Sequence, residues 1–193
     1  MFHKGLNKQI IIEAAKDLIE EIGFAEFSMR TLAEKLGVKT ASLYTHIASM
    51  DVLVTEVGLS ALNAQKTAQL AAVDGKENDA AVSALAESYR EFAKEHAELY
   101  KLIMQMPTGK DETLQTAAAM IAEPSMRVLR GYPLSEERRM HWQRVLRGVM
   151  HGFVSQEASG YFSHYPVNPE ESYRTAVRCV IDGLHREVLQ NEC

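Results

Sequence analysis

The chain has 193 residues, a hydrophobic fraction of 46% and a formal net charge of -5 at pH 7. This length allows one or two compact domains, and the apolar fraction is sufficient for a packed core, which excludes a disordered chain. No apolar run approaches the ~18 residues of a membrane span, and the N-terminal segment lacks the hydrophobic stretch of a secretory signal. We therefore expect a cytoplasmic protein with no membrane partner.

The first predicted element is a helix that runs from Asn7 and stops at Gly23. Its apolar residues recur at helical spacing, at Ile11, Ala14, Ala15, Leu18, Ile19 and Ile22. Phe24 and Phe27 follow as loop residues. We expect both rings to fill the core of a small N-terminal domain.

The stretch from Ser28 to Leu53 predicts two short helices joined by a tight turn and followed by a third helix, which is a helix-turn-helix. Ser28 is a favourable N-cap, and Gly37 stands where a helix ends with positive φ. We expect Thr40 to cap the second short helix. Leu43 and Ile47 should then point into the core.

The side chains left outside suit DNA. Arg30 lies in the first turn of the first short helix, and the outer side of the second carries Lys39, Thr40, Ser42, Tyr44 and His46. A lysine binds phosphate, hydroxyls bind phosphate or base edges, and a tyrosine packs on sugar and thymine methyl groups. Residues 1 to 50 hold six basic and six acidic residues. We therefore expect a modest affinity that falls with salt.

The run IGFAEFSMRTLAEKLGVKTASLYTHI resembles the DNA-binding domain of the tetracycline-repressor (TetR) family of bacterial transcription regulators. The resemblance implies a homodimeric, all-helical regulator that binds a double-stranded DNA operator and has a ligand-responsive C-terminal body. Family members commonly carry a phosphate-binding lysine near the start of the next helix. This chain has Ala48, Ser49 and Met50 there, so the matching stretch offers no lysine for that contact.

The body is predicted as a series of helices. Ser49 is expected to cap a long helix over 52–73, and further helices are expected over 80–96, 97–106 and 113–130. A turn is expected at Pro107, and Pro124 should kink the helix over 113–130 or split it. Ser135 opens the next helix as a cap. The last helix is expected over 170–189.

The helix after Ser135 carries two stripes. One is apolar, with Trp142, Val145, Leu146, Val149, Met150 and Phe153, and the other is small, with Gly148, Gly152, Ser155 and Ser159. Two faces imply two neighbours, and we expect the last two helices to pack together and to dimerise. The segment WQRVLRGVMHGFVSQEASGYF also resembles the body of a TetR subgroup marked by a tryptophan, a His-Gly pair and a glycine before phenylalanine. In this chain these positions hold Trp142, His151, Gly152, Gly160 and Phe162.

No catalytic pattern is present in the sequence: it lacks a phosphate loop, a dinucleotide glycine pattern, HExxH and a Gly-x-Ser-x-Gly elbow. His141 and His151 do not share a helix face and make a poor metal pair. Cys179, within a predicted helix, is expected to be a small core residue, and Cys193 forms no framework with it. We expect no metal, no cofactor and no enzyme activity.

Flexible thioethers and aromatic rings are numerous in the body. Such side chains can line an adaptable apolar pocket, and the candidates are Tyr89, Phe92, Tyr100, Met104, Met120, Trp142, Met150 and Phe153. Ordinary core packing is the alternative explanation for them. If the pocket exists, its ligand is a small apolar effector.

The sequence thus predicts an all-α protein with a helix-turn-helix DNA-binding domain over residues 1–48. A helical bundle for ligand binding and dimerisation follows over 49–193. The predicted function is a ligand-responsive repressor that binds a pseudo-palindromic operator as a homodimer. Activation is not separable from repression at this level. The rival interpretation is a helical small-molecule-binding protein or enzyme with a degenerate DNA-binding head.

Overall fold

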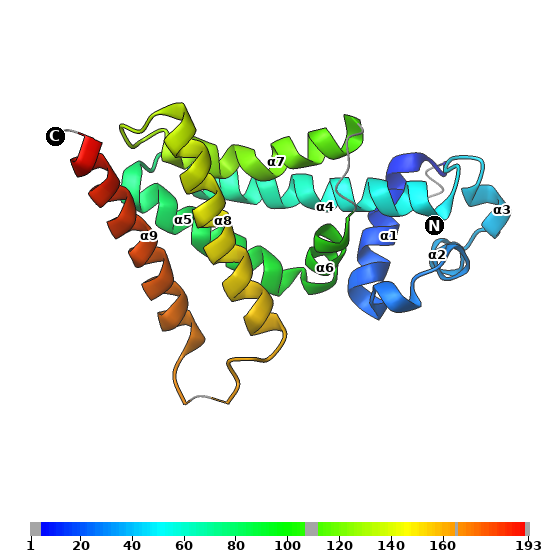
Figure 1. Cartoon of the computed structure of the whole chain (residues 1–193). Coiled ribbons are helices and arrows are strands. Elements are labelled where there is room, and N and C mark those ends of the chain that lie inside the picture. Colours follow the sequence, from blue (N-terminus) through cyan, green and yellow to red (C-terminus); the bar gives the residue numbers. More distant parts are fainter. Residues whose placement is uncertain (1–4, 107–111, 165, 192–193) are drawn as a thin grey trace. The chain divides into compact units, whose positions relative to one another are not determined.

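The computed structural model describes residues 5–106, 112–164 and 166–191, and the regular elements of this described part are all helices (Figure 1). The all-α prediction is confirmed. The turn expected at Pro107 and the residue Cys193 lie outside the described residues. The helices belong to two compact units, one formed by Met1–Ala64 with His96–Leu114 and the other by Gln65–Glu95 with Gln115–Cys193.

The first unit, called the head unit below, contains the predicted helix-turn-helix. Its elements are α1 (Lys8–Ile22), the short 3-10 helix η1 (Phe24–Glu26), α2 (Met29–Leu36), α3 (Thr40–Leu43), the first part of α4 (Met50–Ala72) and α6 (Ala97–Gln105). Helix α4 continues into the second unit. The helix expected over 52–73 thus starts two residues earlier, and the Ser49 hydroxyl accepts the Val52 N–H at 3.2 Å as predicted.

Local caps set the ends of α1. The Asn7 side chain accepts the Ile10 N–H at 3.0 Å, and Gly23, with φ 81°, donates its N–H to the Ile19 carbonyl at 2.8 Å. The buried face of α1 is apolar, as the spacing predicts, and consists of Ile11, Ile12, Ala15, Leu18 and Ile19. Of the two rings expected in this core, Phe27 is buried, whereas Phe24 lies in η1 and is half-buried.

Helix α6 packs on α1 within the head unit. The Glu20 carboxylate of α1 accepts the Glu98 N–H in the first turn of α6 at 3.4 Å, and its other oxygen lies 3.4 Å from His96 Nδ1. A carboxylate at this position faces the positive end of the α6 dipole, which is a favourable arrangement. This contact ties a segment of the second half of the sequence to the first helix.

The second unit, called the body unit, holds the last part of α4, α5 (Asn78–Glu95), most of α7 (Glu112–Leu129), α8 (Glu136–Ala158) and α9 (Pro169–Asn191). Helices α8 and α9 lie side by side (Figure 1), and α5 contacts both. Ser135 caps α8 by accepting the Arg138 N–H at 3.2 Å, as predicted. Pro124 does not split α7, which is one helix through that residue.

Long-range polar contacts join the helices of the body unit. Arg90 of α5 donates two hydrogen bonds to Glu157 of α8, at 2.8 and 2.6 Å. These bonds lower the pKa of the Glu157 carboxyl, against the opposing effect of burial. Tyr173 of α9 is buried and donates its hydroxyl to the Ala86 carbonyl at 2.7 Å. Burial raises the pKa of this phenol.

A second polar cluster lies at the start of α5. Asp79 accepts the Tyr132 hydroxyl at 2.7 Å, and His185 Nε2 of α9 lies 2.9 Å from the same carboxylate. Burial and this carboxylate raise the pKa of Tyr132. The cluster therefore connects α5, the segment after α7, and α9.

One expectation about exposed faces is wrong. Cys179 is exposed on α9 and is not a core residue. The apolar stripe of α8 is not buried throughout, since Val145 remains 45% exposed while Leu146 and Met150 are buried. Helical spacing identifies residues on a common side of a helix, but the position of the neighbouring helix decides which of them are covered.

Gly183 is required for the packing of Trp142 on α9. A Cβ added at Gly183 lies 2.6 Å from Trp142 Cη2, closer than carbon atoms approach in packed interiors. Overpacking of this kind costs about 1–3 kcal/mol, whereas alanine in place of glycine inside a helix gains about 0.5–1 kcal/mol. We therefore expect Gly183→Ala to destabilise the native protein in urea unfolding. The same substitution should stabilise a Trp142→Leu background, and stabilisation in both backgrounds would contradict the steric argument.

Within the part of the chain that the structure describes, no helix combines the length and the apolar composition that membrane crossing requires.

Candidate nucleic-acid interface

The helix-turn-helix is built from local signals that the sequence displays. Ser28 and Thr31 form a reciprocal capping box at the start of α2, with the Thr31 N–H donating to the Ser28 hydroxyl at 3.1 Å. Gly37 ends α2 in the left-handed conformation, at φ 66° and ψ 31°, which L side chains rarely adopt. The Val38 N–H then bonds the Ala33 carbonyl at 3.0 Å and completes the turn.

The recognition segment, residues 39–47, differs from its prediction in one respect. Lys39, with an extended backbone, occupies the N-cap position of α3, so Thr40 is the first helical residue and not the cap. Helix α3 spans four residues, and the Ile47 N–H bonds the Leu43 carbonyl at 3.0 Å to continue the coil beyond it. Leu43 and Ile47 are buried, as predicted.

The six predicted DNA-contact residues are accessible. Arg30, Lys39, Tyr44 and His46 are exposed, while Thr40 and Ser42 are half-buried. Tyr44 is 51% exposed, which is unusual for a large aromatic ring with a packed core beside it. Tyr44 and His46 follow the last residue of α3. The recognition segment therefore presents its polar and aromatic side chains on the side opposite Leu43 and Ile47.

Ion pairs neutralise most cations of the head within the described residues 5–64. Between residues 5 and 64, four of the five basic side chains lie within 3.0 Å of a carboxylate oxygen; the pairs are Lys8–Glu56, Lys16–Glu13, Arg30–Glu34 and Lys35–Glu21. In this described range, Lys39 is the basic residue with no carboxylate partner. Lys39 thus carries the uncompensated positive charge, and it lies at the start of the recognition segment.

Sequence reasoning did not single out Ala41 and Thr45, which are exposed in the same segment. The Thr45 hydroxyl donates to the Ser42 carbonyl at 2.7 Å and so holds the end of α3. Ala41 places a methyl group between Lys39 and Tyr44 along the chain. A small side chain there allows close approach of another surface, a signal visible in the sequence.

The residues predicted to line an effector pocket fall in both units. Tyr100 and Met104 belong to α6 of the head unit, whereas the other six belong to α5, α7 and α8 of the body unit. Tyr89, Phe92, Tyr100 and Met150 are buried. Phe153 packs against Tyr173, with ring centroids 5.1 Å apart. The common pocket stays a prediction.

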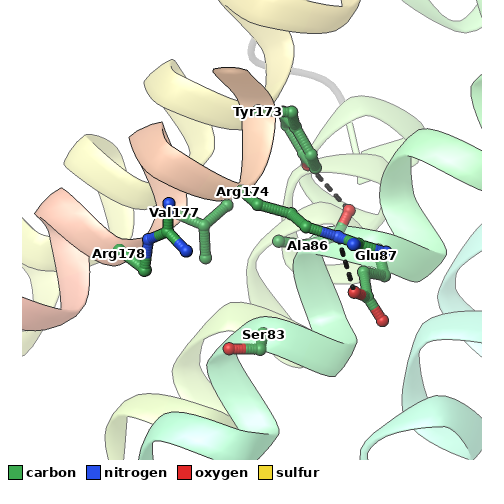
Figure 2. Close-up of a pocket in the computed structure, with 7 residues that line it drawn as sticks. All are labelled: Ser83, Ala86, Glu87, Tyr173, Arg174, Val177 and Arg178. Carbon is green, nitrogen blue, oxygen red and sulfur yellow. Dashed lines mark hydrogen bonds and ion pairs between the residues drawn. The ribbon is translucent and has the colours of Figure 1, made fainter. Parts of the chain in front are cut away.

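The body unit does contain a pocket at a different place, between α5 and α9 (Figure 2). Its volume is about 200 Å³, and it is lined by Ser83, Ala86, Glu87, Tyr173, Arg174, Val177 and Arg178. None of these residues is among the eight predicted ones. The sequence shows each helix separately and gives no sign that α5 and α9 are neighbours.

An all-helical chain with a capped helix-turn-helix and an accessible recognition segment has the architecture of a DNA-binding transcriptional regulator. A family model of bacterial regulatory proteins of the tetR family matches residues 11–57. A model of the tetracyclin repressor-like C-terminal domain matches residues 82–180. The chain belongs to the TetR family of transcriptional regulators, with a DNA-binding N-terminal domain and a ligand-binding C-terminal domain.

Individual relatives agree with this assignment. An uncharacterised HTH-type transcriptional regulator of Mycobacterium tuberculosis is 31% identical over 156 residues, which is 80% of this chain and 72% of that protein. A Rhodococcus protein of unknown function has the same fold, with a TM-score of 0.79, 21% identity and coverage of 94% and 97% of the two chains. A TetR variant of Acinetobacter baumannii in complex with minocycline gives a TM-score of 0.70 at 20% identity, covering 95% and 99%.

Proposed function

We propose that the protein is a homodimeric repressor that binds a pseudo-palindromic operator and is released by a small effector bound in its body. The observation that carries the proposal is the recognition segment, where Lys39, Tyr44 and His46 are exposed above the buried Leu43 and Ile47. Two such segments in one dimer would enter successive major grooves about 34 Å apart.

The DNA-contact residues divide by chemistry. We assign Lys39 and Arg30 to phosphates, with Arg30 leaving its exposed pair with Glu34 at little cost. Thr40 and Ser42 are placed for phosphate or base edges, Tyr44 for a sugar or thymine methyl, and His46 for a phosphate. This domain covers residues 1–48 in our proposal, and residues 49–193 bind the effector and the second subunit.

The exposed face of α8 supports the homodimer. Val145 is 45% exposed, and an added Cβ at Gly148 or Gly152 meets no described heavy atom within 4 Å. An open face of small and apolar residues allows the close approach of a second helix. We propose that α8 and α9 of two subunits pack across a two-fold axis.

The proposed effector is small and apolar and contacts the eight residues Tyr89, Phe92, Tyr100, Met104, Met120, Trp142, Met150 and Phe153. Minocycline in the Acinetobacter relative is one example of a ligand bound by a structural neighbour. By its differential affinity the effector would favour the form that does not bind DNA. We further propose that no metal or cofactor takes part and that the protein acts in the cytoplasm.

We also propose that the chain belongs to the TetR subgroup that its C-terminal sequence resembles. Its support is packing: Trp142 lies against Gly183, and Phe162 lies against Phe153 with ring centroids 4.7 Å apart. These marker residues thus hold α8 against α9 and the segment after α8.

Selection of genomic DNA fragments by the purified full chain tests the function. We expect enrichment of one pseudo-palindromic site, with a Lys39→Gln, Tyr44→Ala double variant as the control that enriches none. Enrichment of no site by the effector-free native chain, after refolding removes any co-purified ligand, would support the rival small-molecule-binding protein or enzyme. The position of the site relative to a promoter then decides between repression and activation.

Lys39→Gln should reduce the salt dependence of operator binding. Loss of one phosphate contact per subunit lowers the slope of log K against log salt by about 0.9, or about 1.8 per dimer. Lys16→Gln is the matched control, because Lys16 is already paired with Glu13 at 3.0 Å and lies on α1. Fluorescence anisotropy over a salt series measures the slope of operator binding for both variants and for the native protein. Equal slopes for Lys39→Gln and the native protein would show that Lys39 does not contact a phosphate of the operator.

A further inference from the structure

The pocket between α5 and α9 has one wall from each helix. Figure 2 shows Val177 and Arg178 on α9 facing Ser83 and Ala86 on α5 across the opening. Tyr173 closes one end, where its hydroxyl bonds the Ala86 carbonyl at 2.7 Å. The walls are therefore held together by a buried hydrogen bond, and the space between them is a feature of the fold.

The two arginines of the pocket differ in their partners. Arg174 lies 2.6 Å from Glu170 and 3.8 Å from Glu87, so its charge is compensated by two carboxylates. Arg178 donates one bond to the Thr175 hydroxyl at 2.8 Å. Among the residues that the structure describes, no carboxylate lies within ion-pair distance of Arg178.

A second pocket shares Glu87, Tyr173 and Arg174 with the first and allows a comparison of how their cations are paired. It has a volume of about 280 Å³ and is lined by Glu87, Arg90, Glu91, Lys94, Glu170, Tyr173 and Arg174. Its cations all face acids of this chain, since Arg90 and Lys94 lie 2.6 and 3.4 Å from Glu157 and Arg174 lies on Glu170. That pocket is neutralised internally, whereas the one beside Arg178 is not.

We propose that the α5–α9 pocket binds a small organic monocarboxylate. The guanidinium of Arg178 has free donors in the fork geometry that matches a carboxylate. Ser83, whose hydroxyl has no hydrogen-bond partner in the described part of the chain, supplies a second donor from the opposite wall. Val177 and Ala86 cover the apolar part of the ligand. Glu87 lines the same pocket and would repel a phosphate dianion, which favours a single negative charge.

The volume of about 200 Å³ limits the ligand to a compact molecule of benzoate size. This site goes beyond the proposed regulatory function. The lining of the α5–α9 pocket contains none of the residues predicted to contact the apolar effector, and none of the recognition segment. We therefore expect a carboxylate to bind in this pocket with or without operator DNA.

A titration of the full native chain with benzoate, in which saturation-transfer NMR detects the bound ligand, tests the proposal. We expect saturable binding that weakens about tenfold or more in Arg178→Gln, because a charge-assisted hydrogen bond is lost. Arg186→Gln on the same helix is the matched control, because Arg186 is exposed and does not line the pocket. The affinity of this variant for benzoate should equal that of the native protein. Ser83→Phe should abolish binding by filling the space.

Neutral benzamide separates charge recognition from apolar packing and should bind at least about tenfold more weakly than benzoate. Equal affinities of native protein and Arg178→Gln for benzoate would overturn the proposal. So would equal affinities of benzoate and benzamide for the native protein. Inorganic phosphate competing as well as benzoate would reject the monocarboxylate class. Unchanged thermal unfolding of the surface variant Arg178→Gln confirms that lost binding is not lost folding.

Discussion

Replacement of Tyr44 by alanine is expected to weaken operator binding at least about tenfold per dimer. The ring is 51% exposed at the end of the recognition segment, so its loss removes a surface contact and leaves the buried residues beside it in place. A bidentate hydrogen-bonded contact to a base contributes about 1–3 kcal/mol, and a packed ring that reaches the lower end of this range gives at least about tenfold because the dimer makes the contact twice. Electrophoretic mobility shift with the selected operator measures the loss.

The control for this experiment is Tyr161→Ala. Tyr161 is 68% exposed in the body unit, so the chemical change and the exposure are similar. Both variants should keep the native helical content in circular dichroism. Operator affinity of Tyr44→Ala within about twofold of the native value, with the fold intact, would rule out this recognition surface.

Replacement of Arg90 by alanine is expected to destabilise the body unit by about 2–4 kcal/mol. Arg90 and Glu157 have side chains only 11% and 19% exposed, and the guanidinium also lies 5.5 Å from the centre of the Tyr173 ring. Removing one partner leaves a largely buried carboxylate with only Lys94 nearby, at 3.4 Å. Breaking a buried pair in this way is much more costly than losing an exposed one.

The effect should depend on pH. Hydrogen bonds from Arg90 hold the pKa of Glu157 below its usual range, so the pair stabilises the folded protein above the unfolded pKa of about 4.3. This stabilisation is lost as pH falls through the lower folded pKa. The difference between native protein and Arg90→Ala should therefore be largest near pH 7 and shrink below about pH 4.

Urea unfolding followed by Trp142 fluorescence measures this difference, because the chain has one tryptophan and it lies in the body unit. Arg174→Ala is the control: its pair with Glu170 has side chains 58% and 46% exposed, and its loss should change stability by at most about 0.5 kcal/mol. Equal effects of the two substitutions would show that burial of the Arg90 pair has no special energetic role.

Local sequence signals predicted much of the fold. Ser28, Ser49 and Ser135 cap helices where they were expected to, and Gly37 adopts the left-handed conformation that ends α2. Each of these features depends on a few consecutive residues. The error at Thr40 is a shift of one position, since an extended Lys39 takes the N-cap without a side-chain bond.

Contacts between residues far apart in the sequence could not be predicted from such local signals. Arg90 and Glu157 are 67 residues apart, and Asp79 and His185 are 106 residues apart. Their pairing depends on α5 lying against α8 and α9, which no local pattern states. For the same reason the sequence did not indicate the pocket between α5 and α9, or that Cys179 would face outward. The predicted recognition residues belong to one continuous segment and needed no such information.

The ion pairs of the head bear on how the protein searches a chromosome. Non-specific binding to DNA depends mainly on cations that displace counterions from phosphates. Four of the five cations between residues 5 and 64 are already paired, and each must leave its carboxylate before it can bind a phosphate, so this described part of the head brings few free charges to a random sequence. Encounters with non-operator DNA should then be brief, and fewer molecules are held by the excess of competing genomic sites. A small number of copies per cell would suffice to occupy one operator.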